Sequence, residues 1–536
     1  MKTTARLITN PKHSEWKHPV VFLAAILAGC SIAPPQTAST KERAGSDGPA
    51  VTEAAVPRQD GDASSGRDVF RFETFGNEGF WTDAVRMPAG MKAARVTPLQ
   101  ALHLGLYIDS DALDQKTLKT ITAELGTDPT GKTSTLLNDP ATTEKLVKAN
   151  AIIGMSSKGN KVGVSCALCH TITDGSIFQI ANAGSIGRRI DGPANHALHT
   201  GELLATAANS RAMFPLLQLT LKANGGKTLG RAPSGLTDTS TEAEVDAYLS
   251  NNQYYPVGMF DDSFDGNGNP MHNSPLFRQD LAAPFGSEGS IARLDNFGNL
   301  AFTALLDPTN LITTGGRAFL HKLGGAAGDE IADSYVRVLQ ATGVRGYPFT
   351  KSTPHAATEE APLGLRVDNK KLLDLNAYLV SLQSPAGAKI DPQVALHGRQ
   401  LFRTSGCTGC HNVDQGKPVS VNVIAMKTIF PGDNPVILAQ REAPLNPVQD
   451  TPGNPFDDKM AVVNASIRGG IRGIALPLLL DLARKPVFLH DNSVPNLGNL
   501  LDPQRGAMAP HPFYLSDGKD RADMVEYLRS LDTNSR

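Results

Sequence analysis

Two short motifs constrain this chain more than any other feature of its sequence. Residues 166–170 read CALCH and residues 407–411 read CTGCH, so a pair of cysteines separated by two residues and followed at once by histidine occurs twice. This spacing is typical of covalent haem attachment, in which the thiols add to the two vinyl groups of one porphyrin and the histidine becomes an axial iron ligand. The sequence therefore predicts two covalently bound haem c groups. The residues expected to hold them are Cys166, Cys169, His170, Cys407, Cys410 and His411.

The cysteine count supports this interpretation. The chain has five cysteines, and the two motifs use four of them. Two structural zinc sites, or a thiol redox pair of the thioredoxin kind, are the alternatives. A zinc site usually brings two such cysteine pairs together at short spacing, whereas these pairs lie far apart and each is followed directly by histidine. Haem attachment is therefore the favoured interpretation.

The N-terminal residues are typical of an exported protein. Residues 1–29 carry basic side chains followed by an apolar run at 20–28, which is too short to span a bilayer as a helix. The run ends in LAGC, which resembles the lipobox of bacterial lipoproteins, so we expect Cys30 to be lipidated and to anchor the chain in a membrane. An ordinary cleaved signal peptide is the alternative. Covalent haem attachment in bacteria is completed outside the cytoplasmic membrane, which agrees with a periplasmic or cell-surface location, and Ser31 favours the outer membrane.

The segment after the lipobox differs in composition from the rest. Residues 30–67 are rich in Pro, Ala, Ser, Thr and Gly, and we expect them to form a disordered tether. The remaining chain is long enough for two or three domains. The formal net charge of -2 provides no basic field for nucleic acid, so nucleic acid is not expected as a partner.

An internal repeat divides the folded body into two units. Residues 372–382 read LLDLNAYLVSL, a helical leucine stripe, and residues 523–531 read DMVEYLRSL, which has the same form and ends in EYLRSL where the first ends in AYLVSL. Each of these helices closes a unit that contains one cysteine motif, and each unit looks like a cytochrome c fold. The predicted fold class is mainly α, with cytochrome c-like haem domains at 68–385 and 386–536.

Each unit is expected to begin with a helix that the closing helix crosses. These leading helices are predicted at 142–154 and 393–402. The first domain is much larger than a cytochrome c needs, so it is expected to be enlarged by long loops and insertions. One of these, residues 260–270, is acidic and glycine-rich. A calcium loop is possible there, but the spacing does not fit an EF-hand, and a turn-rich surface loop is the favoured prediction.

Three further segments carry a family resemblance. They read RRIDG at 188–192, RGI at 472–474 and FLHDNSVPNL at 488–497. Together with the motifs they resemble the di-haem cytochrome c peroxidase and MauG superfamily, in particular its rubber-oxygenase-like branch, most clearly over 162–191 and from about 394 to the end. The resemblance implies two haems with divided labour. The N-terminal iron would keep an open position for peroxide or dioxygen, and the C-terminal six-coordinate iron would relay electrons.

The resemblance also suggests ligands around the second haem. Its distal ligand is expected from the loop before the last helix, which offers His511 and Met508. His511 is favoured because HPF at 511–513 resembles the family's Gly-His-x-Phe segment, although Pro510 replaces the glycine. His490 corresponds to a histidine that the family's peroxidases hold near this haem without using it as the iron ligand.

Arginine side chains are candidates for holding haem propionates, because a guanidinium pairs well with a carboxylate. Solvated surface arginines are the alternative interpretation. The candidates are Arg188, Arg189, Arg468 and Arg472.

The sequence offers no convincing sixth ligand for the first haem. His355 precedes the closing helix, but its context matches no ligand motif and it is predicted to lie at the surface. The family's peroxidases place a Trp between the haems and a Glu in the distal pocket, whereas Trp81 precedes the first motif and Glu202 is only the nearest carboxylate after it. Phe178 packs either against the porphyrin or in the core. The other histidines of this half give no site prediction and are expected to be mostly structural: His196, His199, His272 and His321.

These features predict an exported di-haem c-type cytochrome oxidoreductase. Peroxidase-like chemistry is expected at the haem of His170, with electron relay through the haem of His411. A haem-dependent oxygenase of an apolar organic substrate and a pure electron-transfer cytochrome are the alternatives. The expected partners are a small redox protein or another electron donor, together with peroxide, dioxygen or a small organic substrate.

Overall fold

The computed structural model describes residues 60–226, 232, 234–266, 268, 270–283, 285–286, 291–411, 423–425, 473–475, 477–489, 492–507, 509, 511 and 513–535. All of them belong to the compact unit Pro49–Arg536. The predicted signal segment and most of the predicted tether, with Cys30, lie outside the described residues. No helix in the described ranges is long and apolar enough to cross a membrane.

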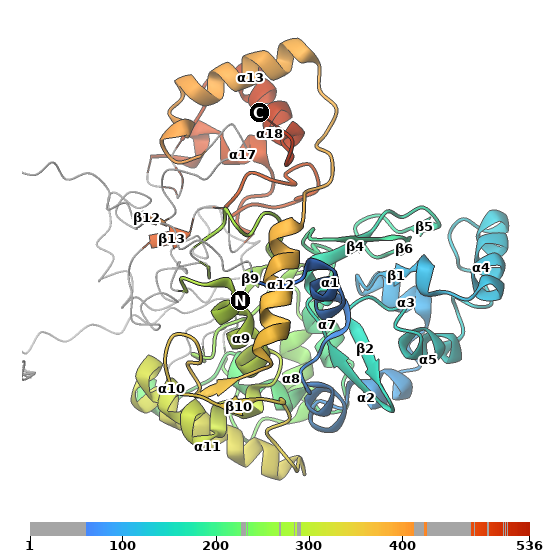
Figure 1. Cartoon of the computed structure of the whole chain (residues 1–536), viewed down its shortest axis with the longest axis vertical. Helices are drawn as coiled ribbons and strands as arrows, with labels where there is room; N and C mark the ends of the chain where they lie inside the picture. The colour runs from blue at the N-terminus through green and yellow to red at the C-terminus, as the bar shows by residue number, and fades with distance from the viewer. Residues whose placement is uncertain are drawn as a thin grey trace, which may run out of the picture. The chain divides into compact units, whose positions relative to one another are not determined.

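The fold is mainly α-helical, as predicted (Figure 1). The α-helices are α1 (Ala63–Phe72), α2 (Met87–Ala93), α3 (Pro98–His103), α4 (Gln115–Thr127), α5 (Pro140–Lys148), α6 (Ala167–His170), α7 (Thr200–Ala205), α8 (Glu242–Leu249), α9 (Leu294–Leu300), α10 (Thr314–Gly324), α11 (Ala326–Ala341), α12 (Asn369–Ser381), α13 (Pro392–Thr404), α17 (Leu497–Leu500) and α18 (Gly518–Ser530). Shorter π and 3-10 turns are η1 (Phe80–Ala84), η2 (Ser110–Ala112), η3 (Ser210–Leu216), η4 (Lys222–Asn224), η5 (Ala301–Leu305), η6 (Pro308–Ile312), η7 (Cys407–Gly409) and η8 (Pro503–Arg505).

The strands are short and form small sheets. They are β1 (Ile108–Asp109), β2 (Met155–Lys158), β3 (Lys161–Val164), β4 (Thr171–Thr173), β5 (Phe178–Gln179), β6 (Ser185–Gly187), β7 (Arg189–Asp191), β8 (Met259–Phe260), β9 (Met271–His272), β10 (Thr353–Pro354), β11 (Leu365–Arg366), β12 (Val423–Ala425) and β13 (Gly473–Ala475). A three-stranded sheet has the order β1-β6-β5, in which β1 and β6 are parallel. The pairs β2-β3, β4-β7, β8-β9, β10-β11 and β12-β13 are antiparallel.

The predicted closing helix of the first unit is α12, and it packs along α1, beside which it lies in Figure 1. The two helices approach closely at Gly66, where a Cβ atom would lie 1.9 Å from the carbonyl oxygen of Asp374 and 2.8 Å from the Cβ of Tyr378. Only glycine fits at this crossing. One turn further along α1, the ring centre of Phe70 lies 5.6 Å from that of Tyr378.

The second predicted pair, α13 and α18, crosses in the same way. A Cβ atom on Gly398 would lie 2.4 Å from the Cβ of Tyr527 and 2.7 Å from the carbonyl oxygen of Asp523. The ring centres of Phe402 and Tyr527 are 6.0 Å apart. Helix α13 begins at Pro392, one residue before the predicted 393, with Pro in its first turn and the Asp391 side chain capping its N-terminus.

The two helix pairs are equivalent residue by residue. The leading helices carry GRDVF at 66–70 and GRQLF at 398–402, and the glycine and phenylalanine of each make the same contacts with their closing helix. In each closing helix a lysine pairs with the aspartate four residues later, at 2.7 Å in α12 and 2.5 Å in α18. The internal repeat of the sequence is therefore a repeat of packing as well.

This repeat corrects the predicted leading helix of the first unit. The helix near 142–154 is α5, but the partner that α12 crosses is α1. Helix α1 begins at Ala63, inside the segment predicted as a tether, so residues 63–67 are helical and that part of the prediction is wrong. The first motif thus follows its leading helix only after an insertion, residues 73–165, which the prediction missed. In the second unit the motif follows α13 directly.

Buried apolar side chains of the described residues form three clusters. The first spans Phe80 to Leu363, the second joins α1, α9 and α12, and the third is built around α13, α17 and α18. Every member of the third cluster follows residue 389. The exact boundary between the two predicted haem domains stays a prediction.

The acidic segment 260–270 differs from expectation. The sequence favours a surface loop there, and this is wrong for Asp261 and Phe264, which are 1% and 5% exposed. Asn267 and Asn269 lie outside the described residues. Phe264 is buried in the first cluster. Because its apolar ring lies in the middle of the loop, residues next to it, such as Asp261, are buried as well.

Candidate haem-binding sites

The first cysteine motif is held against the leading helix. The hydroxyl of Ser165 donates to the carbonyl oxygen of Arg71 at 2.8 Å, which ties the turn before α6 to the end of α1. Cys166 packs beside the second apolar cluster and Cys169 beside the first. Burial raises the pKa of both thiols to about 12, with a small contribution from Cys169 at Cys166. Both groups are therefore neutral thiols at physiological pH.

One hydrogen bond fixes the tautomer of His170. Its Nδ1 lies 2.8 Å from the carbonyl oxygen of Ser274. A carbonyl oxygen can only accept, so Nδ1 carries the hydrogen and Nε2 presents a lone pair. Burial lowers the pKa of His170 to about 4, opposed by the bond to Ser274. Two thiols and a neutral imidazole held in this tautomer fit what a c-type haem requires.

Two loops surround this motif through backbone hydrogen bonds. The amide of Asn195 donates to the carbonyl of Cys169, and the amide of Gly192 donates to the carbonyl of His170, both at 2.8 Å. The amide of Leu276 in turn donates to the carbonyl of Gly192 at 2.8 Å. The segments 192–195 and 274–276 are therefore fixed directly against the motif.

One carboxylate joins the motif to both helices of the first crossing. Asp191 accepts from Arg71 of α1 at 2.6 Å, from Tyr378 of α12 at 2.6 Å and from Thr171 at 2.9 Å. Burial, followed by the charge of Asp191, raises the pKa of the Tyr378 hydroxyl, which keeps it a donor. Asp191 belongs to the RRIDG segment of the sequence, and its structural role is to lock the residue after His170 to the helix pair.

The second motif lies at the end of α13 in the short turn η7. Cys407 and Cys410 are half-buried, and burial raises the pKa of both thiols. The ring centre of His411 lies 6.4 Å from that of Phe402, the residue that also contacts the closing helix. Within the described part of the chain, the buried Nδ1 of His411 has no hydrogen-bond partner.

His511 lies near His411, with the two ring centres 6.5 Å apart and the ring planes inclined by 53°. A first-row metal ion lies roughly 2 Å from each imidazole nitrogen, and each ring centre is about 1 Å further away, so two imidazoles on opposite sides of one iron have centres roughly 6 Å apart. The observed separation fits this arrangement. Burial, followed by the nearby His511, lowers the pKa of His411 to about 4, so His411 is neutral as a metal ligand must be.

Several predicted site residues lie outside the described residues. These are Cys30, Arg468, Arg472, His490 and Met508. Their predicted roles stay predictions, as does the choice between His511 and Met508.

The two described arginines after the first motif differ in surroundings. Arg188 is exposed and pairs with Asp174 at 3.2 Å. The side chain of Arg189 is 4% exposed, pairs with Asp109 and donates to the carbonyl of Asn150 at 2.8 Å. Its Nη1 is buried without a hydrogen-bond partner among the described residues. Arg189 is therefore the better of the two for holding a carboxylate such as a propionate.

The candidates for a distal pocket at the first haem are accounted for by other contacts. Glu202 lies 3.3 Å from Nδ1 of His199, one turn away in sequence. Phe178 packs in the first apolar cluster, which agrees with its interpretation as a core residue. The indole nitrogen of Trp81 donates to the carbonyl of Leu306 at 3.1 Å, and the ring belongs to the same cluster.

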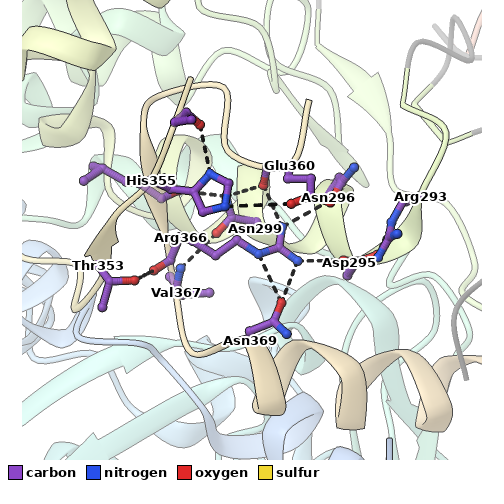
Figure 2. A network of polar contacts seen from close by, with 12 residues as sticks. Arg293, Asp295, Asn296, Asn299, Thr353, His355, Glu360, Arg366, Val367 and Asn369 are labelled. Atoms are coloured by element: carbon purple, nitrogen blue, oxygen red, sulfur yellow. Dashed lines mark hydrogen bonds and ion pairs between the residues drawn. The ribbon is translucent and has the colours of Figure 1, made fainter. Parts of the chain in front are cut away.

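His355 lies in a polar network that Figure 2 shows around the buried Arg366. The imidazole Nδ1 bonds the carbonyl of Ala356 at 2.9 Å, and Nε2 lies 3.8 Å from Glu360. His355 is partly exposed and borders a cavity of about 830 Å³. It is a polar residue of the β10-β11 hairpin, in line with its expected surface position.

The donor groups at the centre of this network all have hydrogen-bond partners. The guanidinium of Arg366 donates all five of its hydrogens, to Asn369, Asn296, Asp295 and the carbonyl of Glu360. Asp295 is also bonded by Arg293 through two contacts, at 3.1 and 2.9 Å. The charges of Arg366 and Asp295 are paired within the protein. Because the partners of Arg366 lie on the hairpin, on α9 and at the start of α12, the network joins these three elements.

Sequence reasoning missed Ser274 and the leading helix α1. Ser274 acts through its main chain, so no residue type marks it. Helix α1 could have been found from the repeated GRxxF at 66–70 and 398–402. Within the described residues, no group of three His, Cys, Asp or Glu side chains forms a metal site.

Comparisons with known proteins add little to this geometry. No family model and no curated protein matches the chain. Among solved structures, a chain of hydrazine synthase from Kuenenia stuttgartiensis is similar over 56% of this chain and 84% of its own length, at 15% sequence identity and a TM-score of 0.27. A likeness this weak carries no argument about function.

Proposed function

We propose that this protein is an exported di-haem c-type cytochrome that reduces peroxide at the haem of His170 and receives the electrons through the haem of His411. The support comes from two equivalent helix crossings, each beside one cysteine motif, and from the neutral imidazoles that follow the cysteines. The superfamily resemblance of the sequence points the same way.

One difference between the two units carries the proposal. The closing helices α12 and α18 begin at Asn369 and Gly518, and the same offset relates their matching aspartates and tyrosines. By this offset, His511 corresponds to Pro362. A proline has no side chain that can bind iron, and residues 360–364 (EAPLG) contain no His, Met, Cys, Lys or Tyr. By this alignment, the segment that offers the His511 imidazole in one unit offers no iron-binding side chain in the other.

Each of the following residues then has a separate role in holding the two proposed haems. Ser274 accepts the Nδ1 hydrogen of His170, which would leave the Nε2 lone pair available to a haem iron. His411 and His511 would hold the second haem, and the buried Nη1 of Arg189 would be a donor for a propionate of the first. A haem iron with an open position binds small oxidants, whereas a six-coordinate one passes electrons.

Reduction of hydrogen peroxide to water requires electrons from outside the protein. A small redox protein is the donor that fits a cytochrome held at a membrane by a lipid. A relay cytochrome without substrate chemistry is the competing function, and it requires a sixth protein ligand at the first haem.

The decisive experiment uses the reduced protein and the variant Pro362→His. A pyridine haemochrome assay should first find two covalent haems per chain. Hydrogen peroxide should then reoxidise the wild-type protein rapidly, as followed by haem absorbance. Pro362→His introduces an imidazole at the sequence position that matches His511 and should slow this reaction at least tenfold, whereas Pro362→Ala should react like the wild type. A reduced wild-type protein that peroxide does not oxidise would favour the relay function.

A further inference from the structure

The proximal hydrogen bond of the first haem comes from a segment that also contacts the C-terminal part of the chain. Ser274, the acceptor for His170, lies two residues after His272 of β9. Between them, the amide of Asn273 donates to the carbonyl of Gly258 at 2.9 Å, and its side chain donates to the carbonyl of Asn195 at 3.2 Å. The segment is therefore extended and held at several points.

The ring of His272 is held from both sides by the segment 485–489. Its Nδ1 lies 2.8 Å from the carbonyl oxygen of Leu489, and its Nε2 lies 3.0 Å from Nζ of Lys485. A carbonyl can only accept and an ammonium can only donate, so both contacts are satisfied by one state, the neutral imidazole with its hydrogen on Nδ1. The two contacts fix the ring's orientation as well as its position.

The chain from Leu480 to Leu489, which includes the segment that holds His272, contacts two apolar clusters. Leu480 is buried in the second cluster, whereas Leu482 and Phe488 are buried in the third, against which Cys407 packs. Lys485 also lies close to His196, where its charge adds to burial in lowering the imidazole pKa to about 3. The segment thus reaches from the core of the second unit to the loops around His170.

From these contacts we infer that His272 is a positioning residue for the first haem: held by Lys485 and Leu489, it places the carbonyl of Ser274 against His170 and so sets the reduction potential of that haem. The inference rests on the proposed haem at His170 but not on its reaction with peroxide. A hydrogen bond from Nδ1 strengthens the imidazole as an electron donor to the metal and favours the oxidised iron. A weakened Ser274 contact therefore raises the potential.

The test compares three variants by potentiometric titration of the two haems. His272→Phe keeps a ring but removes both contacts, and it should shift the reduction equilibrium of the first haem three- to tenfold toward the reduced form, roughly 30 to 60 mV for one electron. His272→Asn retains a donor where Nδ1 lies and should restore most of the wild-type potential. His321→Phe is the control, because His321 is exposed on α10 and pairs with Asp329.

Resonance Raman of the ferrous protein gives a second readout. The iron–histidine stretch of the first haem should fall in frequency in His272→Phe and return in His272→Asn. Unchanged potentials in a folded His272→Phe protein with two covalent haems would overturn the inference, as would an equal shift in His321→Phe. These potentials can be measured whether or not peroxide reacts, so the failure of the proposed function would be recognised separately.

Discussion

The crossing of α1 and α12 predicts a sharp response to one added methyl group. Gly66→Ala would place a Cβ atom 1.9 Å from the carbonyl oxygen of Asp374, whereas real Cβ atoms essentially never approach closer than 3.0 Å. The helices must therefore separate by about 1.1 Å, the difference between these distances. Neither clashing group is the flexible end of a side chain, so the backbone has to move.

The magnitude follows from two opposing effects. Overpacking of a close contact destabilises by roughly 1–3 kcal/mol, and a backbone clash belongs at the upper end. Alanine in place of glycine in a helix stabilises by about 1 kcal/mol. We expect Gly66→Ala to lower the free energy of unfolding by about 2 kcal/mol. Gly398→Ala, with its nearest contact at 2.4 Å, should lower it by about 1 kcal/mol.

The matched control is the same substitution where space is open. A Cβ atom on Gly126 of α4 would meet nothing within 4 Å, so Gly126→Ala should stabilise by up to about 1 kcal/mol. Urea unfolding followed by far-ultraviolet circular dichroism measures all three variants. Because α1 contacts α6, which carries Cys169 and His170, Gly66→Ala should also change the absorbance of the proposed first haem. Equal stability of Gly66→Ala and Gly126→Ala would refute the packing argument.

Three further predictions concern other parts of the chain. His511→Ala should convert the second haem from low to high spin in the optical spectrum, whereas Met508→Ala should not, and the reverse result would move the assignment to Met508. Arg366→Met removes five hydrogen bonds and one charge from beside Asp295, which is 1% exposed, and should cost about 3 kcal/mol in urea unfolding, against less than about 1 kcal/mol for the exposed Arg317→Met. Burial alone would raise the pKa of Asp295, but the hydrogen bonds from Arg293 and Arg366 outweigh it and hold the pKa below its ordinary value of 3.8. The stability that ionised Asp295 contributes is therefore present above pH 3.8 and is lost as the pH falls through the folded pKa, so the difference in urea midpoint between wild type and Asp295→Asn should shrink in acid.

Periodic and capped elements were predictable from the sequence. The apolar helical pattern at 372–382 and 523–531 predicted α12 and α18, and the helix predicted at 393–402 is α13. Helices of this kind can be predicted because the apolar stripe and the capping residues that specify them lie within a few positions of one another in the sequence.

Long-range packing was not predictable in the same way. Helix α1 lies far in sequence from the motif beside which it packs, and the insertion of 73–165 hides the relation. The residue that accepts from His170 is Ser274, whose contribution is a main-chain carbonyl. Burial of Asp261 beside Phe264 likewise depends on tertiary packing, which overrode the composition of an acidic, glycine-rich loop.

The candidate site was predictable where chemistry requires side chains at fixed spacing. The cysteines and histidines of the two motifs belong to this class, and the prediction that they and His511 hold haem stays a prediction. The tautomer of His170 depends on a partner more than a hundred positions away, so it emerged only from the fold.

Electron paramagnetic resonance of the fully oxidised protein tests the central claim most directly. The account predicts two ferric signals of equal weight: a high-spin signal from the haem of His170, whose unit has Pro362 where the other has a ligand, and a low-spin signal from the haem held by His411 and His511. Cyanide should convert the high-spin signal to low spin. Two low-spin signals in the protein without cyanide would contradict the account.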